Sequence, residues 1–258
     1  MTKYAVVTGS TSGIGRAFAK KLAKEKYNLI LVSRDKSKLL DQQKVLSKEH
    51  GIVIHTIAID LTEPGAAKRV FEEVTQRRLA VEILINNAGF NECGKFLETD
   101  IEKEVSMIRL HAICTTELMK FFLPAMVEAR YGRIVNLGST GSYMACPDDA
   151  VYAATKAYIL QMSKGINAEL KGTGVVVTTL CPGSTKTAFA SKAGMEGTLL
   201  FKLFVMEPEA VADIGYRAMH KGRTSVIAGL YNKLLVLTSK ITPSAILNPL
   251  TQKMLTKS

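Results

Sequence analysis

The sequence has no tryptophan, and aromatic side chains make up only 7% of its 258 residues. Cysteine is also scarce: its four copies lie far apart, and no two of them form a C-x-x-C pair. This spacing argues against a disulfide framework and against a zinc site, and it favours reduced, mostly buried thiols. We therefore expect a cytoplasmic protein without a metal centre.

A long hydrophobic run is missing from the N-terminus, where "MTKYAVVTGS" reaches glycine and serine after a few apolar residues. That pattern is typical of neither a signal peptide nor a membrane span.

Acidic residues are missing from residues 214–258, which hold seven Lys or Arg in a chain of net charge +11. Two interpretations of this basic segment stay open: attraction of an anionic ligand or membrane surface, and a solvated rim around a folded terminus. No RNP motif or zinc-finger spacing accompanies the charge, so we expect no nucleic-acid partner.

The remaining composition, 47% hydrophobic and 22% charged residues, describes a globular protein. Short runs rich in Val and Ile alternate with helical patterns, and strands that are continuously apolar are those buried on both faces. The alternation predicts one doubly wound α/β domain over residues 1–258, a parallel sheet with helices on both faces. The expected strands are 4–8, 28–32, 52–59, 81–86, 132–137 and 174–180, and the expected helices lie near 14–26, 36–49, 63–78, 98–130 and 152–171.

The pattern loosens after Pro182. Residues 183–207 mix glycine, small polar residues and a late apolar stretch. They are compatible with a lid over a site and equally with a surface excursion that carries a short amphipathic helix.

A glycine-rich turn, "TGSTSGIG", separates the first expected strand from the first helix. Gly9, Gly13 and Gly15 let the chain turn tightly and bring backbone N–H groups close to a ligand, and the helix N-terminus favours an anionic pyrophosphate. Three glycines directly after the first buried strand indicate dinucleotide binding far more strongly than one glycine in a turn.

The motifs that follow this turn have an order that resembles the short-chain dehydrogenase/reductase family. They are "NNAG" at 86–89, Ser139 thirteen residues before Tyr152, Lys156 four residues after Tyr152, and "CPGSTKT" at 181–187. The resemblance covers most of the chain and implies a Rossmann fold, a nicotinamide cofactor and carbonyl–alcohol chemistry. The cofactor-binding positions that it implies are Gly9, Ser10, Thr11, Ser12, Gly13, Ile14, Gly15, Ser33, Arg34, Asp60, Leu61, Asn87, Ala88, Gly89, Tyr152, Lys156, Pro182, Gly183, Thr185 and Thr187.

The resemblance assigns Tyr152 as the general acid/base, although an unperturbed tyrosine titrates near pH 10. Lowering its pKa to about 7 requires about 4 kcal/mol. One positive charge at about 5 Å, in an effective dielectric near 20, supplies about 3 kcal/mol. Lys156 lies on the same helix face four residues later, so we predict that it lowers the pKa of Tyr152. The family's lysine also holds the ribose hydroxyls of the cofactor.

The family's serine hydrogen-bonds the substrate oxygen, and we carry this role to Ser139. Tyr143 and Tyr158 have no lysine four residues later. We interpret Tyr143 as part of the pocket wall and Tyr158 as a helix-packing residue.

The family's fourth catalytic residue, an asparagine on the long helix before the fifth strand, corresponds here to His111. The asparagine is thought to position a water through its backbone carbonyl at a helix irregularity. A histidine can keep that carbonyl and can also join a proton relay. The alternative is a histidine packed inside the helix without a chemical role.

The second expected strand ends at Val32, so Ser33 occupies the position where an acidic residue would bind the 2′-hydroxyl of NAD. Arg34 follows, and an arginine there pairs with a 2′-phosphate for which serine leaves room. The pattern predicts NADP (NADPH) as the cofactor rather than NAD, with a solvated Arg34 as the alternative. Asp35 is interpreted as the cap of the next helix.

Apolar and charged residues in the 183–207 segment suggest a bulky apolar carbonyl substrate. The segment 225–258 resembles the C-terminal part of hydroxysteroid dehydrogenases and long-chain 3-ketoacyl reductases, which implies that it frames the substrate mouth. We predict an NADP-dependent oxidoreductase for a steroid-like or fatty acyl ketone. The alternative is an NADP-binding regulator or membrane-surface protein that uses the fold without turnover. The family also implies a homodimer or homotetramer.

Overall fold

Seven parallel strands form one sheet in a computed structural model that describes residues 3–195, 197–198 and 205–255. The strand order is β3-β2-β1-β4-β5-β6-β7, so the chain winds outward from β1 in one direction and then from β4 in the other. The doubly wound α/β prediction is confirmed. The strands are β1 (Lys3–Thr8), β2 (Asn28–Ser33), β3 (Ile54–Ala58), β4 (Ala80–Asn86), β5 (Gly132–Leu137), β6 (Val175–Cys181) and β7 (Ser225–Ile227).

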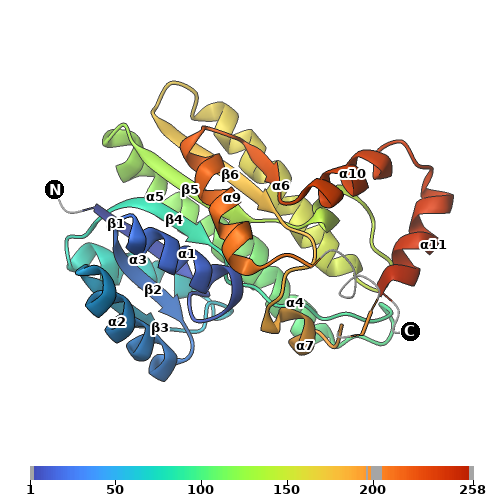
Figure 1. The fold of residues 1–258 in the computed structure, drawn as a ribbon, viewed down its shortest axis with the longest axis horizontal. Helices are drawn as coiled ribbons and strands as arrows, with labels where there is room; N and C mark the ends of the chain where they lie inside the picture. Colours follow the sequence, from blue (N-terminus) through green and yellow to red (C-terminus); the bar gives the residue numbers. More distant parts are fainter. Residues whose placement is uncertain (1–2, 196, 199–204, 256–258) are drawn as a thin grey trace.

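Helices connect these strands and cover both faces of the sheet (Figure 1). A π-helical stretch, η1, and a short 3₁₀ turn, η2, interrupt the α-helical pattern before and after β5. The helical elements are α1 (Gly13–Lys24), α2 (Lys36–His50), α3 (Ala66–Gln76), α4 (Ile101–Ile108), η1 (Arg109–Cys114), α5 (Thr115–Glu128), η2 (Thr140–Tyr143), α6 (Ala150–Glu169), α7 (Ala188–Lys192), α9 (Pro208–His220), α10 (Leu230–Ser239) and α11 (Ser244–Leu255).

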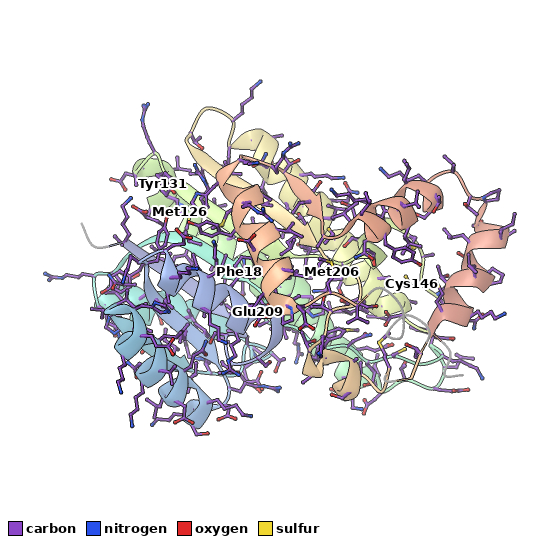
Figure 2. The ribbon with its side chains drawn as sticks, viewed as in Figure 1. Phe18, Met126, Tyr131, Cys146, Met206 and Glu209 are labelled. Atoms are coloured by element: carbon purple, nitrogen blue, oxygen red, sulfur yellow. The ribbon has the colours of Figure 1, made fainter. Side chains whose placement is uncertain are left out.

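Two hydrophobic cores lie on opposite faces of the sheet. Because side chains alternate along a strand, Ala5 and Val7 of β1 join the core with α1, α2 and α9, whereas Tyr4 and Val6 join the core with α3 and α5. Phe18 of α1, labelled in Figure 2, is fully buried in the first core. Strands that are buried on both sides need apolar residues at nearly every position, which explains the continuous Val and Ile runs.

Residues 101–128 form one helix that is long and apolar enough, by length and composition alone, to cross a membrane. In this fold the helix covers the sheet, and Leu118, Phe122 and Met126 are buried in the second core. The requirement to cover a buried parallel sheet therefore accounts for its hydropathy.

The C-terminal part of the chain contains features that the sequence reading did not specify. The short strand β7 extends the sheet beyond β6, and α10 and α11 project beyond it as the red elements at one end of the molecule (Figure 1). The expected lid, 183–207, begins and ends side by side, because Thr185 forms a parallel bridge with Met206. Its residues 196 and 199–204, and 256–258 of the C-terminal segment, lie outside the described residues.

Candidate active site

One cavity of about 330 Å³ opens where the carboxyl ends of the central strands meet. Open α/β sheets bind ligands at this edge, where the strand order reverses, here between β1 and β4. The cavity runs from the turn after β1 to the C-terminal helices. Four residues of its wall directly follow β1, β4, β5 and β6, namely Gly9, Asn87, Gly138 and Pro182. Two more, Leu235 and Met254, come from α10 and α11.

The glycine turn forms one end of this cavity. Gly9 and Gly13 have φ angles of +62° and +51°, a region that favours glycine. A Cβ on Gly9 would lie 2.8 Å from Asn87 Nδ2, and a Cβ on Gly13 would lie 2.8 Å from the Thr187 side chain. Gly15 is buried against the Gly9 carbonyl, where no side chain fits. The turn is thus compact, and its backbone faces the cavity directly.

The N-terminus of α1 is suited to an anion. Ser12 stands at the N-cap position, yet its side chain makes no capping hydrogen bond, and the first turn holds no acidic residue. The N–H groups of a first helical turn have no partner within the helix, and the helix dipole is positive there. Ser12, Gly13 and Ile14 all line the cavity. These residues fit the pyrophosphate of a dinucleotide.

Asn87 holds the glycine turn against the end of β4. Its Nδ2 donates to the carbonyls of Thr8 at 2.9 Å and Gly9 at 3.2 Å. The backbone N–H groups of Asn87 and Ala88 donate to Thr8 Oγ1 at 2.9 and 3.0 Å. The "NNAG" motif therefore joins two strand ends and borders the cavity with Asn87, Ala88 and Gly89.

Ser33 and Arg34 occupy the cavity wall beyond β2. The hydroxyls of Ser33 and Thr11 lie 2.9 Å apart, which ties this wall to the glycine turn. Arg34 is exposed and pairs with Asp60 at 3.4 Å. Its guanidinium thus remains accessible to a phosphate. Asp35 caps α2 by accepting from Lys38 N–H at 3.1 Å, as its position in the sequence indicated.

Tyr152 and Lys156 both face the cavity from the start of α6. The Lys156 ammonium lies 5.5 Å from the centroid of the Tyr152 ring. It donates to the backbone carbonyl of Leu137 at 3.0 Å, which fixes it beside the end of β5. The side chains of both catalytic candidates therefore meet inside the molecule, and Lys156 is only 5% exposed.

The protonation of this pair differs from the sequence-based estimate. Burial raises the pKa of Tyr152 above its ordinary value, and the nearby Asp149 carboxyl adds to that effect. A hydrogen bond with the Ser139 side chain acts in the opposite direction but does not overcome burial. Burial also lowers the pKa of Lys156 to about 8. We expected Lys156 to supply most of the lowering of the Tyr152 pKa and an oxidised nicotinamide to supply the remainder. In the protein alone burial outweighs the lysine, because desolvation disfavours the phenolate.

Ser139 comes directly after β5 and caps η2. Its Oγ accepts from Gly141 N–H at 3.1 Å, and its own N–H donates to Ser142 Oγ at 3.0 Å. These bonds hold the hydroxyl at the cavity wall beside Tyr152. The bond with Gly141 uses a lone pair of Ser139 Oγ, so the serine O–H can donate to Tyr152 or to a substrate oxygen in the cavity.

His111 lies in η1, so the helix irregularity expected at this position is present as a π-helical stretch. The ring is buried and does not line the cavity. Its Nδ1 lies 2.9 Å from Thr155 Oγ1, and its ring meets that of Tyr152 edge-on at 5.8 Å between centroids. Burial and the charge of Lys156 hold the pKa of His111 well below its usual range. The ring is therefore neutral and supports Tyr152 from behind.

Nearly all of the residues predicted to bind the cofactor line the cavity. The exceptions are Ser10, which is buried behind the turn, and Gly15, which packs against the turn. Tyr143 was predicted to be part of the pocket wall, and this is wrong: its ring lies between Lys164 and Lys240, at 6.0 and 5.9 Å. The residue is half-buried, its hydroxyl interacts with Cys181 and Ser225, and it does not line the cavity.

Tyr158 links two helices, with its hydroxyl 2.9 Å from Thr116 Oγ1 of α5. This contact agrees with its interpretation as a helix-packing residue. Its ring is nevertheless 44% exposed on the outer surface of α6, so it does not belong to the core.

Sequence reasoning missed most of the wall at the end of the cavity beyond Tyr152. This wall combines apolar side chains with two buried polar ones. One signal was available, because Asp149 precedes Tyr152 by three residues and shares its helix face. The missed residues at this end are Phe90, Asn91, Met144, Cys146, Asp149 and Phe189.

The family follows from comparison of the whole chain with known proteins. Residues 3–196 match the family described as short chain dehydrogenase. The chain belongs to this family. The dehydrogenase is also similar, over 93% of its length, to a solved short-chain dehydrogenase from Sphingobium yanoikuyae in complex with NADPH. That match has 29% identity and a TM-score of 0.82, and it covers 95% of the solved chain.

Two curated relatives show the range of substrates within this similarity. A 7beta-hydroxysteroid dehydrogenase of Collinsella aerofaciens is 27% identical over 90% of this dehydrogenase and 88% of the relative. A sulfoacetaldehyde reductase of Chromohalobacter salexigens is 32% identical over 73% of this dehydrogenase and 75% of the relative. The chain is an oxidoreductase of this family, and it resembles the branch that holds hydroxysteroid dehydrogenases and ketoacyl reductases.

Proposed function

We propose that this dehydrogenase interconverts a bulky apolar ketone and its secondary alcohol with NADP(H), and that it is built to reduce the ketone. The observation that carries this proposal is the meeting of Ser139, Tyr152 and Lys156 in one cavity with the glycine turn of β1. A regulator that only sensed the cofactor would not need these three side chains together.

Each of these residues has a chemical task that its geometry supports. Ser139 presents its hydroxyl beside Tyr152, where it can hold the substrate oxygen. Tyr152 donates a proton to that oxygen as the ketone becomes an alcohol. Lys156 keeps a positive charge 5.5 Å from the ring centroid, which stabilises the phenolate left behind. A bound nicotinamide would supply the hydride.

The protonation states of Tyr152 and Lys156 supply the proton that ketone reduction needs. Because burial raises the pKa of Tyr152, the phenol carries its proton at neutral pH. The pKa of Lys156 is about 8, so most of the lysine is charged there. A neutral phenol beside an ammonium is the form that donates a proton, so the resting enzyme is ready for the reductive direction near pH 7.

The preference for NADP rests on Ser33 and Arg34. Both line the cavity next to the glycine turn, and Asp60 is the acidic partner of Arg34. A 2′-phosphate would offer Arg34 a charge-assisted bond, whereas the 2′-hydroxyl of NAD finds no carboxylate at position 33. The similar solved dehydrogenase from Sphingobium yanoikuyae is in complex with NADPH, which supports this preference.

The bulky apolar substrate is supported by the cavity wall beyond Tyr152. Met144, Phe189, Met195, Leu235 and Met254 contribute to that wall. Large flexible side chains of this kind fit an extended apolar body, and the name of one relative states activity on a hydroxysteroid. The sulfoacetaldehyde reductase shows that a small polar substrate must also be tested.

A substrate panel tests the proposal directly. Ketosteroids, 3-ketoacyl thioesters, simple ketones and sulfoacetaldehyde would be assayed by the loss of NADPH absorbance. We expect the highest kcat/KM with a bulky ketone and little activity with sulfoacetaldehyde. Absence of turnover with every ketone would contradict the proposed activity.

A membrane surface is a second candidate partner, because α10 carries exposed apolar residues. Leu230, Leu234 and Leu237 are 83%, 58% and 61% exposed, and Lys233 lies among them. Such a face can lie on anionic lipid without spanning it. Co-sedimentation with vesicles of anionic and of neutral lipid, at low and high salt, separates this role from a solvated face.

We also propose that the dehydrogenase is a cytoplasmic homodimer or homotetramer. Its four cysteines form no disulfide with one another, and Ile113 and Tyr158 expose apolar surface on adjoining long helices. Light scattering after size-exclusion chromatography would give the mass in solution, and a monomer would contradict this assembly.

A further inference from the structure

Asp149 holds a carboxyl group at the substrate end of the cavity, where the mechanism above does not use it. It lies three residues before Tyr152, at the start of α6, and it lines the cavity. Only 8% of the residue is exposed. A carboxylate in such a place is costly to keep without a partner, so its retention requires an explanation.

Helix capping does not explain it. Asp149 stands at the N-cap of α6, the position where an aspartate usually accepts from the first turn, yet its side chain makes no capping hydrogen bond. The backbone of Asp149 accepts from Ala153 N–H at 3.0 Å, so the helix begins normally. The carboxyl group is therefore turned away from the helix that its residue starts.

An ion pair does not explain it either. The side chains that influence the charge of Asp149 are Asn91 and Asp148, and neither is a cation. Burial raises the pKa of Asp149 to about 7, although a hydrogen bond from Asn91 acts to lower it. The carboxyl group thus lies among uncharged and acidic neighbours, where a donor would be strongly favoured.

Two acceptor atoms at this place lack partners within the described residues. They are Oδ1 of Asp149 and Oδ1 of Asn91, both buried. Asn91 is 5% exposed, lines the same cavity, and directs its Nδ2 to Met195 Sδ at 3.5 Å. Buried acceptors normally find a donor, and the cavity that both residues line is where a bound ligand can supply one.

The cavity wall around Asp149 and Asn91 is otherwise apolar, so these two side chains are its polar groups at this end. Met144, Cys146 and Phe189 line the cavity nearby, and Cys146 lies between the sheet and α11 in Figure 2. Phe189 also packs on the Tyr152 ring, 5.8 Å between centroids. Asp149 and Tyr152 are one helical turn apart and line the same cavity. A ligand whose carbonyl contacts Tyr152 therefore extends close to Asp149.

We propose that Asp149 and Asn91 form a recognition subsite for a hydrogen-bond donor on the substrate, a hydroxyl or an amine carried close to the reacting carbonyl. The inference deepens the proposed function and rests on it, since the position of the carbonyl is taken from Tyr152. It assigns the substrate to donor-bearing bulky ketones. No covalent change occurs at the subsite: the donor is held while the carbonyl reacts.

The experiment compares three ketones of one bulky skeleton that differ at a single carbon near the carbonyl, bearing a hydroxyl, a methoxy or an ammonium group. The methoxy compound keeps the oxygen and removes the donor. In the wild-type enzyme we expect kcat/KM to favour a donor-bearing ketone over the methoxy ketone by at least about tenfold, the usual effect of a bond to a charged group. In Asp149→Leu the ratio should fall to about one.

Further variants identify the donor and control for structure. Asp149→Asn keeps an acceptor but no charge, so it should lose a preference for ammonium and retain much of one for hydroxyl. Asp41→Asn, at an exposed position of α2 outside the cavity, is the matched control and should leave every ratio unchanged. If circular dichroism shows that Asp149→Leu does not fold, two other variants replace it. The kcat/KM ratio of the ammonium ketone to the methoxy ketone should fall in Asp149→Asn, and the ratio of the hydroxy ketone to the methoxy ketone should fall in Asn91→Ala.

Calorimetric binding of the same compounds separates failure of the subsite from failure of the proposed function. If no ketone is turned over, the proposed activity fails, and the ratio of Kd values in wild type and Asp149→Leu then decides the subsite alone. A wild-type ratio near one, equal ratios in wild type and Asp149→Leu, or no binding of any of the three compounds would overturn the subsite.

Discussion

The ammonium of Lys156 lies 5.5 Å from the ring centroid of Tyr152 and is tied to the Leu137 carbonyl at 3.0 Å. This bond fixes the lysine from a neighbouring strand rather than from its own helix. The charge therefore stays beside the phenol even though both side chains are buried. Catalysis in the proposed reaction depends on this placement more than on any lowering of the tyrosine pKa in the protein alone.

Replacing Tyr152 with phenylalanine should reduce kcat for ketone reduction by about 10²–10⁴-fold, because the proton donor is removed. NADPH binding, followed by fluorescence, should stay within a few-fold of wild type. Tyr158→Phe is the matched control, since Tyr158 lies on the same helix outside the cavity, and it should keep full activity. Near wild-type turnover in Tyr152→Phe would remove this residue from the chemistry.

The rate of reduction should fall as pH rises through about 8. Burial lowers the pKa of Lys156 to about 8, so the ammonium is present below that pH and lost above it. A pH series of kcat/KM with saturating NADPH would show this decrease at alkaline pH, the alkaline limb of the profile. Lys156→Arg should move the limb to higher pH, because a guanidinium stays charged. A profile that is flat up to pH 10 in the wild type contradicts the role of the lysine charge.

Removing the Arg34 side chain should weaken NADPH use selectively. For Arg34→Ala we expect kcat/KM with NADPH to fall by about 10–100-fold, the value of a charge-assisted bond to phosphate, while NADH is little affected. Arg217→Gln, on the far helix α9 where Arg217 pairs with Asp213 at 2.9 Å, is the control. Equal losses with both cofactors would indicate a structural role for Arg34.

Asp149→Asn should stabilise the enzyme at alkaline pH. The pKa of Asp149 is raised by burial from 3.8 to about 7, so the folded state holds the proton more tightly than the unfolded state. The free energy of unfolding of the wild type should therefore fall by up to about 4 kcal/mol as pH rises from about 4 to 7. Asp149→Asn has no proton to lose at this position, so its free energy of unfolding should not show this decrease. Urea unfolding at pH 4.5 and 8 should give a small difference at the first pH and a large one at the second.

The titratable and polar groups that face the Asp149 carboxyl are Asn91, Asp148, Tyr152 and Cys146. None of them carries a positive charge. A variant that is no more stable than wild type at pH 8 would show that water or a relaxed wall already solvates the carboxylate.

His111→Asn should lower turnover by less than about tenfold and leave the acid side of the pH profile unchanged. The pKa of His111 is held well below its usual range by burial and by the charge of Lys156, so its ring is neutral near pH 7. His111→Ala should cost more, because it leaves a cavity behind the Tyr152 ring. Loss of an acid limb in His111→Asn would instead identify the histidine as a proton carrier.

Residues that act through local spacing were the ones that sequence reasoning located. Gly9, Gly13 and Gly15 follow a buried strand, and Lys156 follows Tyr152 by one helical turn, so local geometry brings the members of each pattern together. The resemblance to the family supplied the catalytic role of the tyrosine–lysine pair. Asp35 caps α2 for the same local reason. The strand alternation likewise predicted the parallel sheet, since burial on both faces leaves continuous apolar runs in the sequence.

Long-range packing decided the remainder. Tyr143 was placed wrongly because its surroundings come from Lys164 and Lys240, residues of other elements. Asn91 and Asp149 meet although 58 positions separate them along the chain.

The sequence by itself therefore determined the fold, the glycine turn and the tyrosine–lysine pair, because these depend on periodicity and on contacts within a few residues. The tertiary structure alone decided the protonation of that pair, the neutral state of His111 and the acceptor pair at the substrate end. Desolvation and polar contacts depend on how distant segments enclose a group, and no local pattern records that enclosure.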